Sequence, residues 1–172
     1  TAPQSADMSQ GFLEQGEDAA RKREFQKAHD LLTQACTMNP RCARACKAQG
    51  AVYLAESNHK EAWQWFKRGH ELDPNDPRIL SGMGMCLMME NNPQEAYQYF
   101  VRSLEIAPDH LMTLMQLVES SYRVCRFDHL EQFLRQYVIQ HPNDMEMVYC
   151  HAGSLYKLGR NTEAEQFAQR VL

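Results

Sequence analysis

Proline recurs every 34 residues along this chain, and two other residue types follow the same period. Glycine and alanine share the interval, and Ala164 returns two periods after the third alanine. The residues in register are Pro40, Pro74, Pro108 and Pro142; Gly16, Gly50 and Gly84; and Ala28, Ala62 and Ala96. A fixed period of this length is typical of stacked supersecondary units, none of which can bury its apolar face alone. The period therefore predicts binding along an extended surface and not chemistry in a closed pocket.

Each period reads as two amphipathic helices separated by a short turn. In the second period a turn at Ser57-Asn58 precedes a helical spacing of apolar and small residues that ends at Asp73-Pro74. Asn58 stands three residues before Glu61, and Asn92 three residues before Glu95, which is the pattern of a helix N-cap with a reciprocal partner. A proline closes each second helix because it cannot continue the hydrogen-bond ladder.

These spaced residues resemble the tetratricopeptide repeat, a 34-residue helix–turn–helix unit. The second and third periods carry its small, large and closing residues, namely Gly50, Tyr53, Ala62, Phe66, Gly69 and Pro74, then Gly84, Leu87, Ala96, Phe100, Ser103 and Pro108. The resemblance implies an all-α, right-handed superhelical solenoid of about five repeats. It places a disordered segment at 1–8 and a single array over 9–172, divided into 9–42, 43–76, 77–110, 111–144 and 145–172.

Composition excludes several classes of function. The net charge of −4 supplies no basic field for nucleic acid, and no apolar run is long enough to span a bilayer. The six cysteines lie mostly in helical segments, so we expect reduced thiols and a cytoplasmic location. Cys42 and Cys46 stand one helical turn apart, but no CxxC or HExxH motif accompanies them. We therefore predict no metal, no cofactor and, in the absence of a readable catalytic constellation, no enzyme activity.

The resemblance also implies a binding groove, lined by the first helix of each repeat. Its groove-facing positions supply a central methionine patch, with basic side chains at one end and tyrosines at the other. The candidate binding residues are Arg44, Lys47, Arg78, Met85, Met88, Met89, Met112, Met115, Glu119, Tyr122, Tyr149 and Tyr156. Methionine adapts to varied apolar partners, and tyrosine adds rigid contact area. We expect a scaffold, adaptor or chaperone that binds an apolar or amphipathic peptide, extended or helical, although two of the five methionines can be partly buried.

Two alternatives stay open. The last helix carries Ala164, Phe167, Ala168 and Val171 with no polar capping helix after them, which would favour a self-assembling homo-oligomer. The chain can also be the targeting arm of a larger enzyme. The basic clamp with which related repeats hold a terminal carboxylate is not present in either register of the sequence.

The fourth repeat departs from the pattern of the others. It places Val118, Leu130 and Tyr137 where the other repeats keep small residues, and Ser121 where they have a large one. Overpacking a helix crossing costs about 1–3 kcal/mol, so the helices should separate instead. We therefore expect a wider helix pair over 111–140 than over 43–72 or 77–106.

Overall fold

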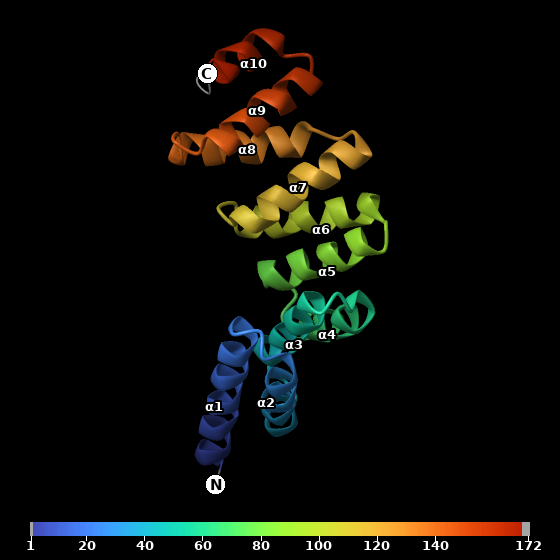
Figure 1. Cartoon of the computed structure of the whole chain (residues 1–172), viewed down its shortest axis with the longest axis vertical. Coiled ribbons are helices and arrows are strands. Elements are labelled where there is room, and N and C mark those ends of the chain that lie inside the picture. Colours follow the sequence, from blue (N-terminus) through green and yellow to red (C-terminus); the bar gives the residue numbers. More distant parts are fainter. Residues whose placement is uncertain (1, 170–172) are drawn as a thin grey trace. The chain divides into compact units, whose positions relative to one another are not determined.

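The computed structural model describes residues 2–169, and within that range it contains ten α-helices and no strand (Figure 1). The first five helices are α1 (Ala2–Arg21), α2 (Phe25–Met38), α3 (Ala43–Ala55), α4 (His59–Leu72) and α5 (Pro77–Met89). The second five are α6 (Pro93–Ile106), α7 (Leu111–Val124), α8 (Asp128–Gln140), α9 (Met145–Lys157) and α10 (Asn161–Ala168). The predicted all-α helical-repeat fold is thus confirmed.

The chain forms two compact units, Thr1–Glu90 (unit 1) and Asn91–Leu172 (unit 2). Unit 1 contains α1 to α5 and unit 2 contains α6 to α10. The boundary between them falls inside the repeat predicted over 77–110.

The N-terminal segment differs from the expectation of disorder over residues 1–8. Helix α1 begins at Ala2 and is 20 residues long, so residues 2–8 continue the first repeat helix backwards, and residue 1 lies outside the described residues. Alanine, glutamine and methionine favour helix, and a proline is tolerated in a first turn because its missing amide would be unpaired there.

Side chains at the helix starts satisfy backbone amides as the sequence predicts. Asn58 and Asn92 accept hydrogen bonds from the amides of Glu61 and Glu95, each at 3.4 Å. The side-chain amide nitrogen of Asn92 also donates to the Glu95 carboxylate at 2.9 Å, so the two residues are reciprocal partners. Unpaired amides in a first helical turn are costly, and these contacts fix where α4 and α6 begin.

The turn inside each repeat uses the same backbone device. The residue with positive φ recurs with the 34-residue period, at Arg23, Ser57, Asn91, Cys125 and Gly159, with φ between 55° and 75°. Left-handed backbone suits glycine and strains most other residues. Only the last of these five positions is a glycine, so this regularity of the turns is invisible in residue identity.

Small residues in unit 1 let two helices close on one aromatic ring. The ring of Phe66 on α4 is buried and lies against Gly50 of α3 and Gly82 of α5. A Cβ atom at Gly50 would stand 2.8 Å from that ring, and one at Gly82 would stand 2.5 Å from it. Only hydrogen fits at these two positions, which explains the glycine predicted at the helix crossing.

The fourth repeat is more open than the second. Leu130 and Tyr137 of α8 are buried, as their bulk suggests. The backbones of α7 and α8 approach each other closely at far fewer positions than those of α3 and α4. This agrees with the prediction that the helix pair over 111–140 is wider than the pair over 43–72. The two helices over 77–106 belong to different units, because the boundary lies between them.

Candidate protein-interaction surface

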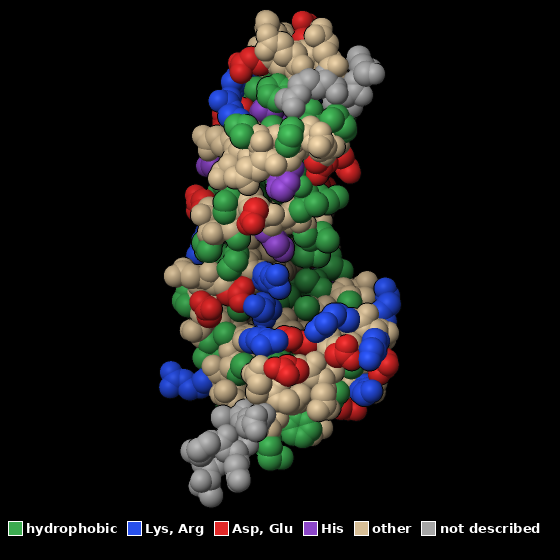
Figure 2. Space-filling view, turned by 90° about the vertical axis from the view of Figure 1, so that its left-hand side faces the viewer, with side chains coloured by type: hydrophobic (Ala, Val, Ile, Leu, Met, Phe, Trp, Pro, Cys, Tyr) green, Lys and Arg blue, Asp and Glu red, His purple; other side chains and the backbone are tan. Residues whose placement is uncertain are grey.

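In unit 1, two of the three cations predicted for the groove pair with carboxylates of the same unit. The Arg44 guanidinium on α3 donates to both carboxylate oxygens of Glu17 on α1, at 2.9 and 2.6 Å. The Lys47 ammonium, also on α3, lies 2.5 Å from the Asp76 carboxylate. Figure 2 shows lysine and arginine side chains interspersed with acidic ones over this unit. Arg44 and Lys47 are therefore engaged in ion pairs within the unit, whereas Arg78, the third predicted cation, is exposed.

Asp76 has two functions at the start of α5. Its carboxylate accepts from the amides of Arg78 and Ile79, at 2.8 and 3.2 Å, and binds Lys47 as well. Burial alone would raise its pKa, but the Lys47 ammonium and the two amides more than compensate, so the pKa of Asp76 is lowered. Lys47 is thus part of the joint between α3 and α5, which argues against a free binding cation.

The methionines of α5 are less available than the sequence suggests. Met85 and Met88 are half-buried, and Met89 is exposed. Two of the five methionines assigned to the groove are therefore partly buried, as the sequence analysis allowed. Core packing accounts for much of their apolar surface.

In unit 2, the predicted groove residues form an exposed surface on α7 and α9. Met112, Met115 and Tyr122 follow one face of α7, and Met112 is 55% exposed. On α9, Tyr149 and Tyr156 are 66% and 64% exposed. We call these five residues the Met/Tyr surface. Glu119 of α7 is exposed within the same helical stripe.

Tyr122 connects the two helices of the Met/Tyr surface. Its hydroxyl oxygen lies 2.8 Å from the point where a Cβ of Gly153 on α9 would stand. The Lys157 ammonium, also on α9, lies 5.9 Å from the centre of the Tyr122 ring, and Phe127 packs edge-on against the ring at 5.1 Å. Burial raises the pKa of Tyr122, so the neutral phenol is favoured. The glycine allows the tyrosine to lie across α9.

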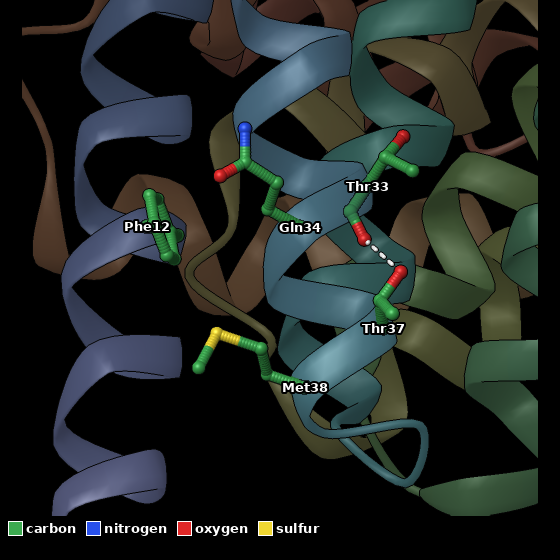
Figure 3. A pocket seen from close by; sticks show the side chains of 5 residues that line it. All are labelled: Phe12, Thr33, Gln34, Thr37 and Met38. Carbon is green, nitrogen blue, oxygen red and sulfur yellow. Dashed lines mark hydrogen bonds between the residues drawn. The ribbon is translucent and has the colours of Figure 1, made fainter.

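The first repeat presents an open hollow between its two helices. Phe12 of α1 and four residues of α2 (Thr33, Gln34, Thr37 and Met38) line this hollow of about 280 Å³ (Figure 3). The residues one repeat period and its multiples beyond Phe12, at Cys46, Leu80, Leu114 and Val148, are buried. Phe12 is half-buried, so the hollow exposes a face that later repeats cover. The hollow was not predicted, because Phe12 alone gives no sequence signal.

A buried charged cluster joins the last three helices of unit 2. The Glu131 side chain on α8 is 7% exposed and accepts from His151 of α9 at 3.0 Å. Arg135 donates to the same carboxylate at 2.7 Å, and Arg160 lies 3.3 Å from it. Burial alone would raise the pKa of Glu131, but these donors hold it below its usual value. The His151 ring also packs against Phe167 of α10 at 4.5 Å, so the cluster is an internal support.

The apolar C-terminal residues that suggested self-assembly are partly covered. Ala164 is buried, and Phe167 is half-buried against His151. Val171 lies outside the described residues.

Two segments of the chain match known repeat families. Residues 13–77 and residues 77–110 each match a family described as tetratricopeptide repeat, and together they span more than half of the chain. The chain belongs to the tetratricopeptide repeat family. Such repeats are in general protein-interaction modules and not catalysts, so the chain is a protein-interaction scaffold in this broad sense.

Solved structures with the same fold differ widely in sequence. The chain is similar to PilF of Pseudomonas aeruginosa (18% identity, 97% of this chain and 76% of that chain, TM-score 0.78). It is also similar to MamA (14%, 96% and 91%, 0.76) and to YrrB, described as a tetratricopeptide-repeat protein with an unusual peptide-binding site (16%, 93% and 82%, 0.73). At this identity the likeness shows the fold alone. No curated protein is significantly similar to the chain in sequence.

Among the residues that the structure describes, no three His, Cys, Asp or Glu side chains are grouped so as to hold a metal ion. No described helix is both long and apolar enough to cross a membrane.

Proposed function

We propose that this tetratricopeptide-repeat protein binds an apolar or amphipathic peptide segment of a partner protein on the Met/Tyr surface of unit 2. The observation that carries the proposal is the exposure of Tyr149 and Tyr156 on α9, a helix that meets Tyr122 of the methionine-bearing helix α7 through Gly153 and Lys157. Exposed tyrosines supply large, rigid contacts and often dominate the energy of an interface. Methionines beside them adapt to the side chains of different partners.

The distribution of charge supports unit 2 over unit 1 as the principal binding face. Arg44 and Lys47 of unit 1 are engaged with Glu17 and Asp76, so a partner that used these two cations would have to displace existing ion pairs. The Met/Tyr surface of unit 2 offers apolar area that a partner can bury directly. The peptide-binding site for which YrrB is described supports a peptide ligand for this fold. An adaptor or chaperone role in the cytoplasm, where thiols stay reduced, fits this proposal.

The experiment compares variants of the two units against the same ligands. Peptides are selected from a phage-displayed random library on the wild-type chain, and their affinities are then measured by fluorescence polarisation. In Tyr149→Glu/Tyr156→Glu, both substitutions lie on exposed positions, so the fold should be retained, and circular dichroism checks this. We expect affinity to fall at least about tenfold, the equivalent of about 1.4 kcal/mol.

Met89→Glu is the matched control, because Met89 is an exposed groove residue of unit 1. The affinities of this variant for the selected peptides should remain within about twofold of those of the wild type, a difference of about 0.4 kcal/mol in binding free energy. Unchanged binding by the tyrosine double variant, or an equal loss in both variants, would remove the binding site from unit 2.

Self-assembly and service as the targeting arm of a larger enzyme remain the alternative proposals. The half-buried Phe167 and the apolar residues around it would favour a homo-oligomer. Sedimentation velocity over a wide range of concentrations distinguishes them, because a strict monomer at the highest concentration contradicts self-assembly.

A further inference from the structure

A tyrosine followed by a cation ends both predicted groove helices of unit 2. Tyr122-Arg123 lies in the last turn of α7 and Tyr156-Lys157 in the last turn of α9, 34 residues apart. All four side chains are exposed. Cations in a last helical turn complement the helix dipole, but the equivalent pairs of the two preceding repeats, at 54–55 and 88–89, are uncharged. The paired tyrosine and cation are therefore a property of this surface and not a requirement of the fold.

Neutral groups hold the cations of these two pairs in place. The Lys157 ammonium lies 5.9 Å from the centre of the Tyr122 ring, and the Arg123 guanidinium donates to the side-chain oxygen of Asn91 before α6. A ring face or an amide oxygen fixes the position of a cation without cancelling its charge. Both side chains are thus positioned while their charge is uncompensated.

Arg126 adds a third cation to this end of α7. Its guanidinium lies 4.9 Å from the centre of the Tyr97 ring on α6, which is again a neutral group. Its neighbour in the chain, Phe127, packs edge-on against the Tyr122 ring at 5.1 Å, so the turn that carries Arg126 lies beside this tyrosine. We call Arg123, Arg126 and Lys157 the basic end of the Met/Tyr surface.

No carboxylate of the described residues neutralises the basic end. The ion pairs found in the described part of unit 2 all involve Glu131 or Glu163, and none involves these three cations. Glu119 stands one helical turn before Arg123 and is exposed. A peptide carboxylate can therefore bind the basic end without displacing an existing ion pair. Because the cations are already held in position, the entropic cost of binding is reduced.

The other end of α7 and α9 has the opposite charge. Residues 103–122 and 136–156 contain no lysine or arginine, whereas Glu105, Asp109 and Glu146 are exposed. The α6–α7 and α8–α9 turns lie on one side of unit 2 (Figure 1). Figure 2 faces that side and shows acidic, histidine and apolar side chains over unit 2, with few lysines or arginines. The Met/Tyr surface is therefore polarised along its helices.

We propose that the basic end of the Met/Tyr surface binds an aspartate or glutamate side chain of the partner, so that the peptide carries a carboxylate beside its apolar residues. The inference rests on the proposed function, because it assigns a charge to the same peptide. The apolar side chains of the peptide cover Tyr149 and Tyr156, and its carboxylate accepts from the Lys157 ammonium or the Arg123 guanidinium. A lysine at the same place is repelled, and a carboxylate at the opposite end meets Glu146. Charge thus selects the partner and sets its orientation.

Peptides selected on the wild-type chain from the phage-displayed library provide the first test. We expect aspartate and glutamate to be more frequent beside the apolar residues of these peptides than in the unselected library, and lysine and arginine less frequent. The selected peptides are synthesised with an amidated C-terminus, so that every carboxylate they offer belongs to a side chain. Exchange of that acidic residue for its amide should weaken binding about threefold to fivefold, the range of an exposed ion pair.

Variants of the basic end test the same contact from the side of the protein. Lys157→Gln and Arg123→Gln should weaken binding of the acidic peptides about threefold to fivefold at about 0.01 M salt, and the difference should vanish at about 1 M salt. Lys157→Arg should bind as the wild type does, because it keeps the charge. The amide-substituted peptides should not distinguish Lys157→Gln from the wild type, since the group that the lysine binds is gone.

Lys67→Gln is the matched control, because it removes the same charge from an exposed position of unit 1. The acidic peptides should bind it as they bind the wild type. Native circular dichroism is required of every variant, because Arg123→Gln also shortens the side chain that contacts Asn91.

Equal affinity of the wild type, Lys157→Gln and Arg123→Gln for the acidic peptides would overturn the proposal. So would a selection without enrichment of acidic residues, or an equal loss in Lys67→Gln, since net charge alone would then explain the effect. Tyr149→Ala/Tyr156→Ala introduces no charge and separates this result from the proposed function. A loss of affinity in this tyrosine variant, with unchanged binding in the cation variants, would leave the proposed function standing and refute the acidic contact. The reverse result would contradict the proposed function and retain the acidic contact.

Discussion

The two units differ in the side chains that they carry at the repeat positions assigned to the groove. In unit 1 these positions carry ions that pair between helices, as Arg44 does with Glu17 and Lys47 with Asp76. In unit 2 they carry exposed apolar and aromatic side chains, and the ionic contacts that join its last helices gather around the buried Glu131. A helical repeat can therefore use these positions for ion pairs between its own helices, or leave them exposed to a partner, without a change of fold.

The ionic interactions of the two units should differ most in their contribution to stability. Glu131→Ala in unit 2 leaves the buried His151 without its acceptor and Arg135 without its carboxylate, whereas Arg160 keeps Glu163; loss of a partner by a buried polar group costs about 1–3 kcal/mol. Glu17→Ala in unit 1 removes the partner of a half-exposed arginine, and such surface pairs contribute less than about 1 kcal/mol. Urea unfolding measures both.

The reporters for this experiment are unevenly placed in the chain. Both tryptophans, Trp63 and Trp65, lie on α4 of unit 1, whereas circular dichroism reports all helices. Glu131→Ala should shift the dichroism transition more than the fluorescence transition. Equal losses of stability in the two variants would contradict the comparison.

Two groove-helix glycines should respond differently to a methyl group. Gly82→Ala in unit 1 presses against the buried ring of Phe66, which has no room to move, and overpacking of this kind costs about 1–3 kcal/mol. Gly153→Ala in unit 2 meets only the hydroxyl end of the exposed Tyr122 side chain, which can rotate away. There the gain in helix propensity of up to about 1 kcal/mol should prevail. Urea midpoints give the signs, and two losses of equal size would show that unit 2 is as tightly packed as unit 1.

Acid should weaken unit 2 through its buried histidine. Burial lowers the pKa of His151 despite the neighbouring Glu131, while Arg135 and Arg160 oppose a further positive charge. Because the folded pKa is the lower one, the unfolded chain binds the proton first, and stability falls as pH drops below the unfolded value of about 6.5. The slope for one such group is at most about 1.4 kcal/mol per pH unit.

His151→Gln tests this dependence, because glutamine keeps a donor for Glu131 but does not titrate. Between pH 7 and about pH 5, above the range in which carboxylates titrate, its urea midpoint by dichroism should change less than that of the wild type. Equal pH dependence in both proteins would exclude His151 as the acid-sensitive group.

The sequence predicts the repeat and the helix starts well, because period, proline and the Asn–Glu pairs are local signals. Tyr149, Tyr156 and Met112, which the sequence assigns to a groove, are exposed in the structure, while the groove itself stays a prediction. Their joint use in binding stays a prediction. The pairing of Arg44 and Lys47, and the cluster around Glu131, could not be predicted, since partners 20 or more residues apart depend on how helices stack.

The smallest effects concern the turns, where the two units should behave alike. Ser57 in unit 1 and Cys125 in unit 2 have φ of 61° and 55°, the conformation that Gly159 adopts at the equivalent turn. Relief of left-handed strain, about 1–2 kcal/mol, is offset in part by the entropy of glycine in the unfolded chain, about 0.5–1 kcal/mol. Ser57→Gly and Cys125→Gly should therefore each stabilise the fold by about 0.5–1 kcal/mol, measured by tryptophan fluorescence and dichroism respectively.

Asn91→Gly is the control without gain, because asparagine tolerates this backbone and its side chain accepts a hydrogen bond from Arg123. A gain in one unit with a loss in the other would mean that the turns, and not only the groove positions, have diverged between the units.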